Sequence, residues 1–104
     1  EVAEKTLRCL YRTVPAAVPG IAFLSGGQSA EVATLHLDLM NKMGPHPWAL
    51  TFSYGRALQD AALKTWKGDA ENIAEAQKMA SHRAKLTSAA ASGTYEQDME
   101  KAGV

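Results

Sequence analysis

The sequence lacks the features that mark several large classes of protein. It has one cysteine in 104 residues, so no internal disulfide can form and a reducing compartment is compatible. Eleven basic side chains balance eleven acidic ones, which argues against a general nucleic-acid or anionic-membrane partner. The apolar runs are too short to span a bilayer, and neither a signal peptide nor an initiating methionine is visible. What remains is the composition of a small globular domain, 46% hydrophobic and 21% charged.

The chain is organised around a short apolar run that ends in a glycine turn. Residues 21–24 (IAFL) are too few for a helix and predict a strand buried on both faces. Ser25, Gly26 and Gly27 follow, and an amphipathic helix is predicted to begin near Ala30. Glycines at a strand-to-helix junction let the backbone turn sharply and expose N–H groups, which favour an anion together with the helix N-terminus. Phosphate is the ligand to expect, although glycine at such a loop can also serve only to turn the chain.

A second strand with the same ending is predicted at residues 48–53 (WALTFS). It leads through Gly55 and Arg56 into a helix that begins near Ala57, whose buried stripe is predicted at positions four apart: Leu58, Ala62 and Trp66. A guanidinium at the end of a buried strand can bind a phosphate with two hydrogen bonds. The alternative is a surface arginine paired with a nearby carboxylate, and position alone does not separate the two.

The remaining segments predict helices. Residues 2–12 are expected to bury Cys9 as a small apolar group, and the helix before Gly44 is expected to be capped by Ser29 and to bury its apolar residues Val32, Leu35, Leu39, Met40 and Met43. His36 and His46 have no partner at metal-ligand spacing and are expected to be structural or surface residues.

The last long helix is predicted to be capped by Asp69 and to run to about Ala91, with His82 and Arg83 on a solvated face. Gly93 ends it, and residues 94–104 are expected to form a polar tail of uncertain order. We therefore expect one structural segment, residues 1–93, followed by this tail.

The alternation of strands and helices predicts an α/β fold with parallel strands and right-handed crossovers. Two parallel strands cannot bury both of their faces, so the chain is expected to be part of a larger α/β structure. In (β/α)8 barrels a phosphate site is commonly built by the loops after the last two strands, which suits the Ser-Gly-Gly and Gly-Arg loops.

Three motifs carry a specific resemblance: RTVP at residues 12–15, FLSGGQS at 23–29 and WALTFSYGRALQ at 48–59. In this order and separation they closely resemble the C-terminal third of class I fructose-1,6-bisphosphate aldolase. The resemblance implies that the chain is the C-terminal part, the last two strand–helix units, of a TIM (β/α)8 barrel. It implies a cytoplasmic lyase that reversibly cleaves fructose 1,6-bisphosphate to dihydroxyacetone phosphate and glyceraldehyde 3-phosphate. The family forms a Schiff base on a lysine, needs no metal or other cofactor, and is usually a homotetramer.

The resemblance also assigns roles to four residues. The serine and first glycine of the LSGGQ motif and the glycine and arginine of the SYGR motif bind one substrate phosphate in the family. Carried onto this sequence, these residues are Ser25, Gly26, Gly55 and Arg56. The assignment agrees with the chemistry expected of the two glycine loops from the residues themselves.

The sequence departs from the family in what it does not contain. None of its lysines falls on a predicted strand, so none is a credible buried nucleophile, and no catalytic residue is expected in this chain. Family members often end in a tyrosine that reaches toward the active site, whereas Tyr95 is not terminal here. The segment alone should not be an aldolase. It should act with the N-terminal barrel strands of a whole enzyme, or else be a non-catalytic phosphate-binding or interaction fragment.

Overall fold

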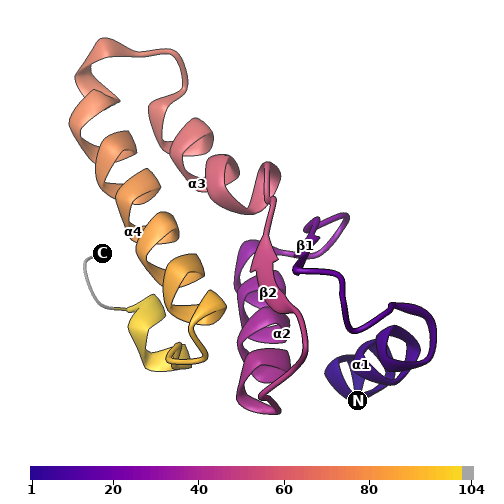
Figure 1. The fold of residues 1–104 in the computed structure, drawn as a ribbon. Coiled ribbons are helices and arrows are strands. Elements are labelled where there is room, and N and C mark those ends of the chain that lie inside the picture. The colour runs from indigo at the N-terminus through magenta and orange to yellow at the C-terminus, as the bar shows by residue number, and fades with distance from the viewer. Residues whose placement is uncertain (102–104) are drawn as a thin grey trace.

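A computed structural model of the protein describes residues 1–101 as an elongated arrangement of helices beside a small sheet, 50 × 23 × 22 Å in extent (Figure 1). The elements follow in the order α1 (Val2–Thr13), β1 (Gly20–Phe23), α2 (Ala30–Lys42), β2 (Ala49–Phe52), α3 (Arg56–Trp66), the 3₁₀ turn η1 (Ala70–Asn72), α4 (Ile73–Ala91) and the 3₁₀ turn η2 (Gln97–Glu100). The alternation of helices and strands predicted from the sequence is confirmed. In the described part of the chain no helix is long and apolar enough to cross a bilayer.

The two strands form a parallel sheet joined by α2. Gly20 pairs with Ala49 and Phe23 with Phe52, and the Ser53 N–H extends the ladder by donating to the Phe23 carbonyl over 2.8 Å. Ser29 caps α2 as predicted, since its hydroxyl accepts from the Val32 N–H at 3.2 Å. The parallel pairing predicted from the sequence is therefore confirmed, and it places the carboxyl ends of both strands at one edge.

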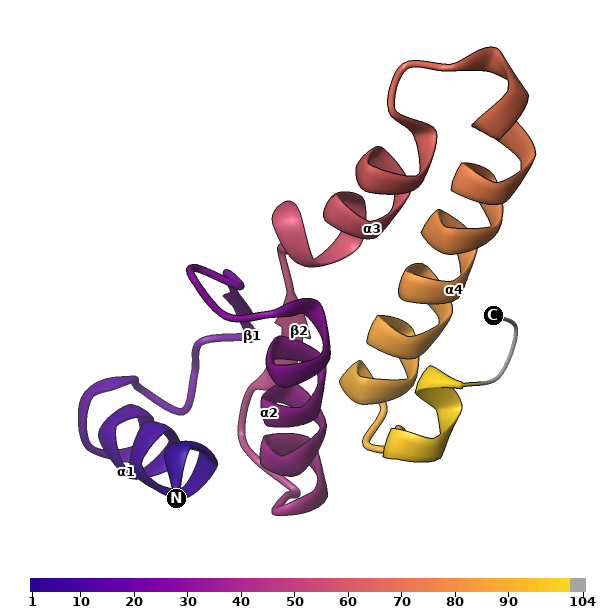
Figure 2. The ribbon, with the colours of Figure 1, turned by 180° about the vertical axis from the view of Figure 1, so that it is seen from behind.

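The prediction that residues 21–24 are buried on both faces is wrong for this chain. Ile21 and Phe23 are half-buried, Ala22 is exposed, and Leu24 lies outside the strand with 75% of its surface exposed. In β2 only Leu50 is fully buried. More buried and more exposed residues alternate along both strands because the described helices cover one face of the two-stranded sheet and leave the other open (Figures 1 and 2).

Helix α2 buries a different face from the one predicted. Its most buried side chains include Ala33 and Leu37, both 0% exposed, whereas Val32, Leu39 and Met43 are exposed. The helix packs on β2 and on α4, so polar residues occupy part of its buried face: Thr34 and Asp38. Met40 is buried as predicted, and Met43 is not.

Helix α1 also turns its cysteine outward. Cys9 is exposed, so its predicted burial is wrong, and the buried residues of α1 are Ala3 and Leu7. These two positions are one helical turn apart and face the rest of the chain, whereas Cys9 lies two positions further on and points away.

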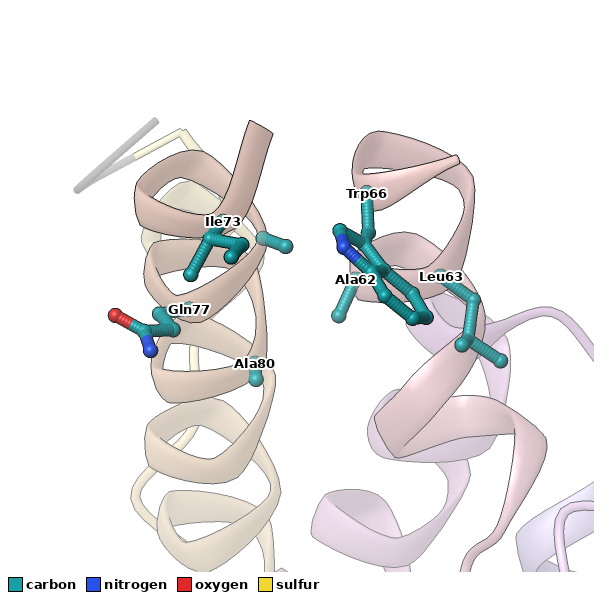
Figure 3. Close-up of a pocket in the computed structure, with 7 residues that line it drawn as sticks. Ala62, Leu63, Trp66, Ile73, Gln77 and Ala80 are labelled. Carbon is teal, nitrogen blue, oxygen red and sulfur yellow. The ribbon is translucent and has the colours of Figure 1, made fainter. Parts of the chain in front are cut away.

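Helices α3 and α4 lie side by side and run in opposite directions (Figures 1 and 2). The prediction of a solvated face at His82 and Arg83 is wrong: Arg83 is 3% exposed and His82 is 9% exposed. Both face the C-terminal segment, which folds back against α4 and covers them. Trp66 was predicted to be buried, but it is 42% exposed, at the end of the helix pair far from the sheet (Figures 1 and 3).

The segment after α4 packs against α2. Tyr95 is 1% exposed; its N–H donates to Asp38 Oδ1 at 3.0 Å, and Lys42 Nζ donates to its carbonyl at 2.7 Å. Lys42 also forms an ion pair of 2.7 Å with Asp38. The predicted division at residue 93 stays a prediction, and the last three residues of the predicted tail, 102–104, lie outside the described residues.

Candidate functional site: two glycine loops at one edge of the sheet

The first loop runs from Ser25 to Ser29 and is closed on itself. The backbone N–H and the side-chain amide of Gln28 both donate to the Ser25 carbonyl, at 3.1 and 3.0 Å. Ser25 is 4% exposed, whereas Gly26 has a φ of +58° and nothing within 4 Å of where a Cβ would lie. Gly26 therefore provides a left-handed turn and an open approach for a ligand directly before the N-terminus of α2.

The second loop carries a cation into the same region. Gly55 is the N-cap of α3 and offers no capping side chain, while its carbonyl accepts from the N–H groups of Leu58 and Gln59 at 3.1 and 3.0 Å. Arg56 is the first residue of α3 and is exposed. A guanidinium at a helix N-terminus adds its full charge to the partial positive charge of the helix.

The parallel register brings these two loops together. Ser25 follows the last residue of β1 by two positions, and Gly55 follows the last residue of β2 by three, so both loops leave the same edge of the sheet. Tyr54 ties the second loop to the helix that follows the first, because its hydroxyl donates to the Ala33 carbonyl at 2.9 Å. Ser25, Gly26 and Gly55 lie on these loops and Arg56 begins the helix that follows the second, an arrangement that can hold an anion between an arginine and exposed backbone N–H groups.

Burial perturbs two tyrosines, Tyr54 of the second loop and Tyr95 of the segment after α4. Tyr54 is 7% exposed, and desolvation raises its pKa to about 12. Desolvation, with the hydrogen bond to Glu100 next in importance, also raises the pKa of Tyr95 well above its usual value. Both hydroxyls therefore stay neutral hydrogen-bond donors at physiological pH.

The histidines of this part of the chain have structural hydrogen bonds. His36 Nδ1 contacts Gln28 Oε1 at 2.6 Å, and His46 links the Tyr11 hydroxyl at 2.6 Å to the Met40 carbonyl at 2.7 Å. Within residues 1–101 no group of three metal-ligating side chains converges. These contacts agree with the prediction that both histidines are structural or surface residues.

Sequence reasoning missed a buried polar cluster at the first turn of α2. Arg83 Nη1 forms an ion pair with Glu100, and Arg83 Nη2 donates to Thr34 Oγ1 at 2.8 Å and to the Ala30 carbonyl at 3.1 Å. The Tyr95 hydroxyl donates to the same Glu100 at 2.7 Å. The one sequence signal for this cluster was Tyr95, the one aromatic residue of the tail that was predicted to be polar.

A separate apolar groove lies between α3 and α4, away from the loops (Figure 3). It has a volume of about 310 Å³, and Leu63 and Trp66 of α3 and Ile73, Gln77 and Ala80 of α4 are among the residues that line it. Its lining is almost entirely apolar, which does not suit a phosphate ester.

Comparison with known proteins identifies the family. The family model described as "Glycolytic: Fructose-bisphosphate aldolase class-I" matches residues 1–104. A fructose-bisphosphate aldolase of Plasmodium falciparum (isolate 3D7) is 54% identical over 96 residues, covering 92% of this chain and 26% of the relative. Fructose-bisphosphate aldolase 1 of Toxoplasma gondii is 58% identical over 91% of this chain and 26% of its own length. The cytoplasmic isozyme of Spinacia oleracea is 57% identical over 91% of this chain and 27% of its own length.

A solved structure also matches. It is a ternary co-crystal structure of the Plasmodium falciparum fructose-bisphosphate aldolase with TRAP and a small-molecule inhibitor, with a TM-score of 0.88 and 55% identity over 91% of this chain and 27% of that chain. The chain belongs to the class I fructose-bisphosphate aldolase family, and its α/β fold is a part of the TIM barrel. It spans about a quarter of the length of the curated relatives that it matches.

Proposed function

We propose that a full-length protein carrying these residues is a class I fructose-bisphosphate aldolase, and that this segment supplies its substrate-phosphate site. The reaction is the reversible cleavage of fructose 1,6-bisphosphate to dihydroxyacetone phosphate and glyceraldehyde 3-phosphate through a lysine Schiff base. The observation that carries the proposal is the family match over the whole chain.

The two loops support the assignment of the phosphate site to Ser25, Gly26, Gly55 and Arg56. They leave the same edge of the parallel sheet, each stands at the start of a helix, and one of them presents an exposed arginine. Backbone N–H groups and a guanidinium are the donors that bind phosphate oxygens most strongly.

Holding the phosphate at this edge would orient the rest of the substrate. Binding energy from a non-reacting phosphate is then used to place the ketose carbonyl against the reacting amine, which lowers the entropic part of the barrier. The segment would thus contribute to catalysis by positioning, without a chemical step of its own.

The reacting lysine would come from another part of the protein. The lysines of residues 1–101 lie on helices or beside them, and Lys42 is already paired with Asp38. Because no lysine of residues 1–101 lies on a strand, a second candidate function is a non-catalytic phosphate-binding or interaction fragment. The two candidates differ in whether a Schiff base forms.

Relatives guide the expected setting of the full-length protein. The spinach and chickpea relatives are cytoplasmic isozymes, and an Arabidopsis relative is cytosolic, so we propose a cytoplasmic enzyme. We further propose a homotetramer that needs no metal or other cofactor, and sugar phosphates as its partners. Binding to TRAP is a property of the Plasmodium aldolase structure.

The test is borohydride trapping. The protein purified from its source is incubated with dihydroxyacetone phosphate and borohydride, and its intact mass is then measured under denaturing conditions. A species several times heavier than 11.1 kDa that gains one reduced adduct supports a whole class I aldolase. A mass near 11.1 kDa without an adduct would instead support the fragment.

A further inference from the structure

The Arg83 cluster joins three separate parts of the chain. Arg83 belongs to α4, Thr34 and the Ala30 carbonyl belong to the first turns of α2, and Glu100 belongs to η2. Thr34 is 0% exposed and Arg83 is 3% exposed, so these contacts form away from water, where hydrogen bonds to charged groups are strong. The first turn of α2 is therefore held from outside the helix.

Glu100 is itself held in place. The Tyr95 hydroxyl donates to Glu100 Oε2 at 2.7 Å, and His82 Nε2 donates to the Glu100 carbonyl at 3.2 Å. A buried guanidinium needs such a counter-charge, because an unpaired cation in the interior is strongly destabilising. At the N-terminus of α2 the need is greater, since the helix dipole disfavours a cation there.

The first turn of α2 directly follows the loop from Ser25 to Ser29, here named the phosphate loop. Ser29 caps α2 through the Val32 N–H, and Gln28 closes the loop onto the Ser25 carbonyl. His36 of α2 contacts the other side of the Gln28 amide at 2.6 Å. The loop between β1 and α2 is short, so a shift of the first turn of α2 would move the N–H groups at Gly26.

We propose that Arg83 is a positioning residue for the phosphate loop: from α4 it holds the first turn of α2, and so sets where the loop presents its N–H groups to a substrate phosphate. This inference rests on the proposed function. Arg83 does not touch the substrate phosphate itself, and it acts through Ala30 and Thr34.

A lysine at the other end of α2 provides a matched comparison. Lys42 also joins α2 to the C-terminal segment, by pairing with Asp38 and donating to the Tyr95 carbonyl. It lies about 18 Å along the helix from Ala30, at the end away from the loop. Loss of Lys42 removes one contact to the Tyr95 backbone and should leave the contacts of Arg83 with Ala30 and Thr34 in place.

The experiment compares variants of the full-length enzyme. Thr34→Val nearly keeps the shape of the side chain and removes the hydroxyl, which accepts from Arg83 and donates to the Ala30 carbonyl at 2.7 Å. Thr34→Ser keeps a hydroxyl, and Arg83→Met removes the guanidinium. For each variant we would measure the Kd for inorganic phosphate, the KM for fructose 1,6-bisphosphate, and kcat per active site counted by borohydride trapping. Lys42→Met and the exposed Lys85→Met serve as controls.

We expect the Kd for phosphate and the KM to rise about threefold to tenfold in Thr34→Val, and at least as much in Arg83→Met, the range for residues that couple to a site indirectly. Thr34→Ser, Lys42→Met and Lys85→Met should stay within about twofold of the wild type. A merely structural role would lower the number of active sites and leave the Kd and KM unchanged. If Arg83→Met does not fold, Thr34→Val decides.

Unchanged phosphate affinity in Thr34→Val would overturn the inference, provided that the wild type binds phosphate and Arg56→Ala weakens that binding. The same would follow if Lys42→Met weakened it equally. If wild type and Arg56→Ala bind phosphate equally poorly, the proposed function fails, and this inference fails with it.

Discussion

Replacing Arg56 with alanine in the full-length protein should weaken the binding of phosphate esters without unfolding it. Arg56 is exposed at the first position of α3, and it takes part in none of the ion pairs within residues 1–101, so its removal should change stability little. A charge-assisted hydrogen bond contributes about 1.5–3 kcal/mol, which predicts a rise of about 10- to 150-fold in the Kd of a phosphate ligand. Because the lost interaction orients the substrate as well as binding it, kcat/KM should fall by at least the same factor.

The assay is titration of inorganic phosphate and of dihydroxyacetone phosphate, followed by steady-state kinetics with fructose 1,6-bisphosphate. Arg56→Lys should recover only part of the loss, since an ammonium cannot make the two parallel hydrogen bonds of a guanidinium. Arg12→Ala is the control, because Arg12 is an exposed arginine in the last turn of α1. Wild-type KM and kcat in Arg56→Ala would refute the assignment of this residue to the phosphate site.

Three further predictions concern Gly26, Tyr54 and Lys42. Gly26→Ala should cost about 1–2 kcal/mol of loop stability because Gly26 has a φ of +58°, and it should weaken phosphate binding, whereas Gly27→Ala should do neither; thermal melts and phosphate titration compare the pair. The pKa of Tyr54 is raised to about 12 in the folded state, so its contribution to stability is fully present below pH 10 and is lost as the pH rises through 12. The free energy of unfolding, measured by denaturation across this range, should fall less steeply with pH in Tyr54→Phe than in the wild type. Equal slopes would contradict the burial argument. Lys42→Met should lower the free energy of unfolding by about 1–3 kcal/mol, since it leaves the Asp38 carboxylate, which is 1% exposed, without its cation; an unchanged urea midpoint would count against that pairing.

Local chemistry anticipated the elements that contain the site. The runs around Ile21 and Leu50 are short, apolar and followed by glycine, which is sufficient to predict strands that end in βα loops. The parallel pairing follows from the helix between them, and it alone places Ser25 and Arg56 at one edge of the sheet. The assignment of phosphate to that edge needed the family resemblance as well, because glycine loops also occur where nothing binds.

The errors share one cause. Burial was predicted from the periodicity of apolar residues along single elements, and it failed where another element decided the outcome. Arg83 was predicted to be a surface residue, but η2 folds back and brings Glu100 to it. Cys9 was predicted to be buried, but Ala3 and Leu7 occupy the inner face of α1. Trp66 was predicted to lie in the core, but it lines a groove between α3 and α4.

The sequence by itself determined the order and type of the elements, the capping of α2 by Ser29, the left-handed turn available at Gly26, and the family to which the chain belongs. These properties depend on neighbours within a few residues or on the wording of motifs. Only the tertiary structure decided which polar groups are buried and what they pair with. Such pairs join residues as far apart as Thr34 and Arg83, and Asp38 and the Tyr95 N–H. The burial of Arg83 is tolerated because its charge meets Glu100, a partner that no local pattern in the sequence specifies.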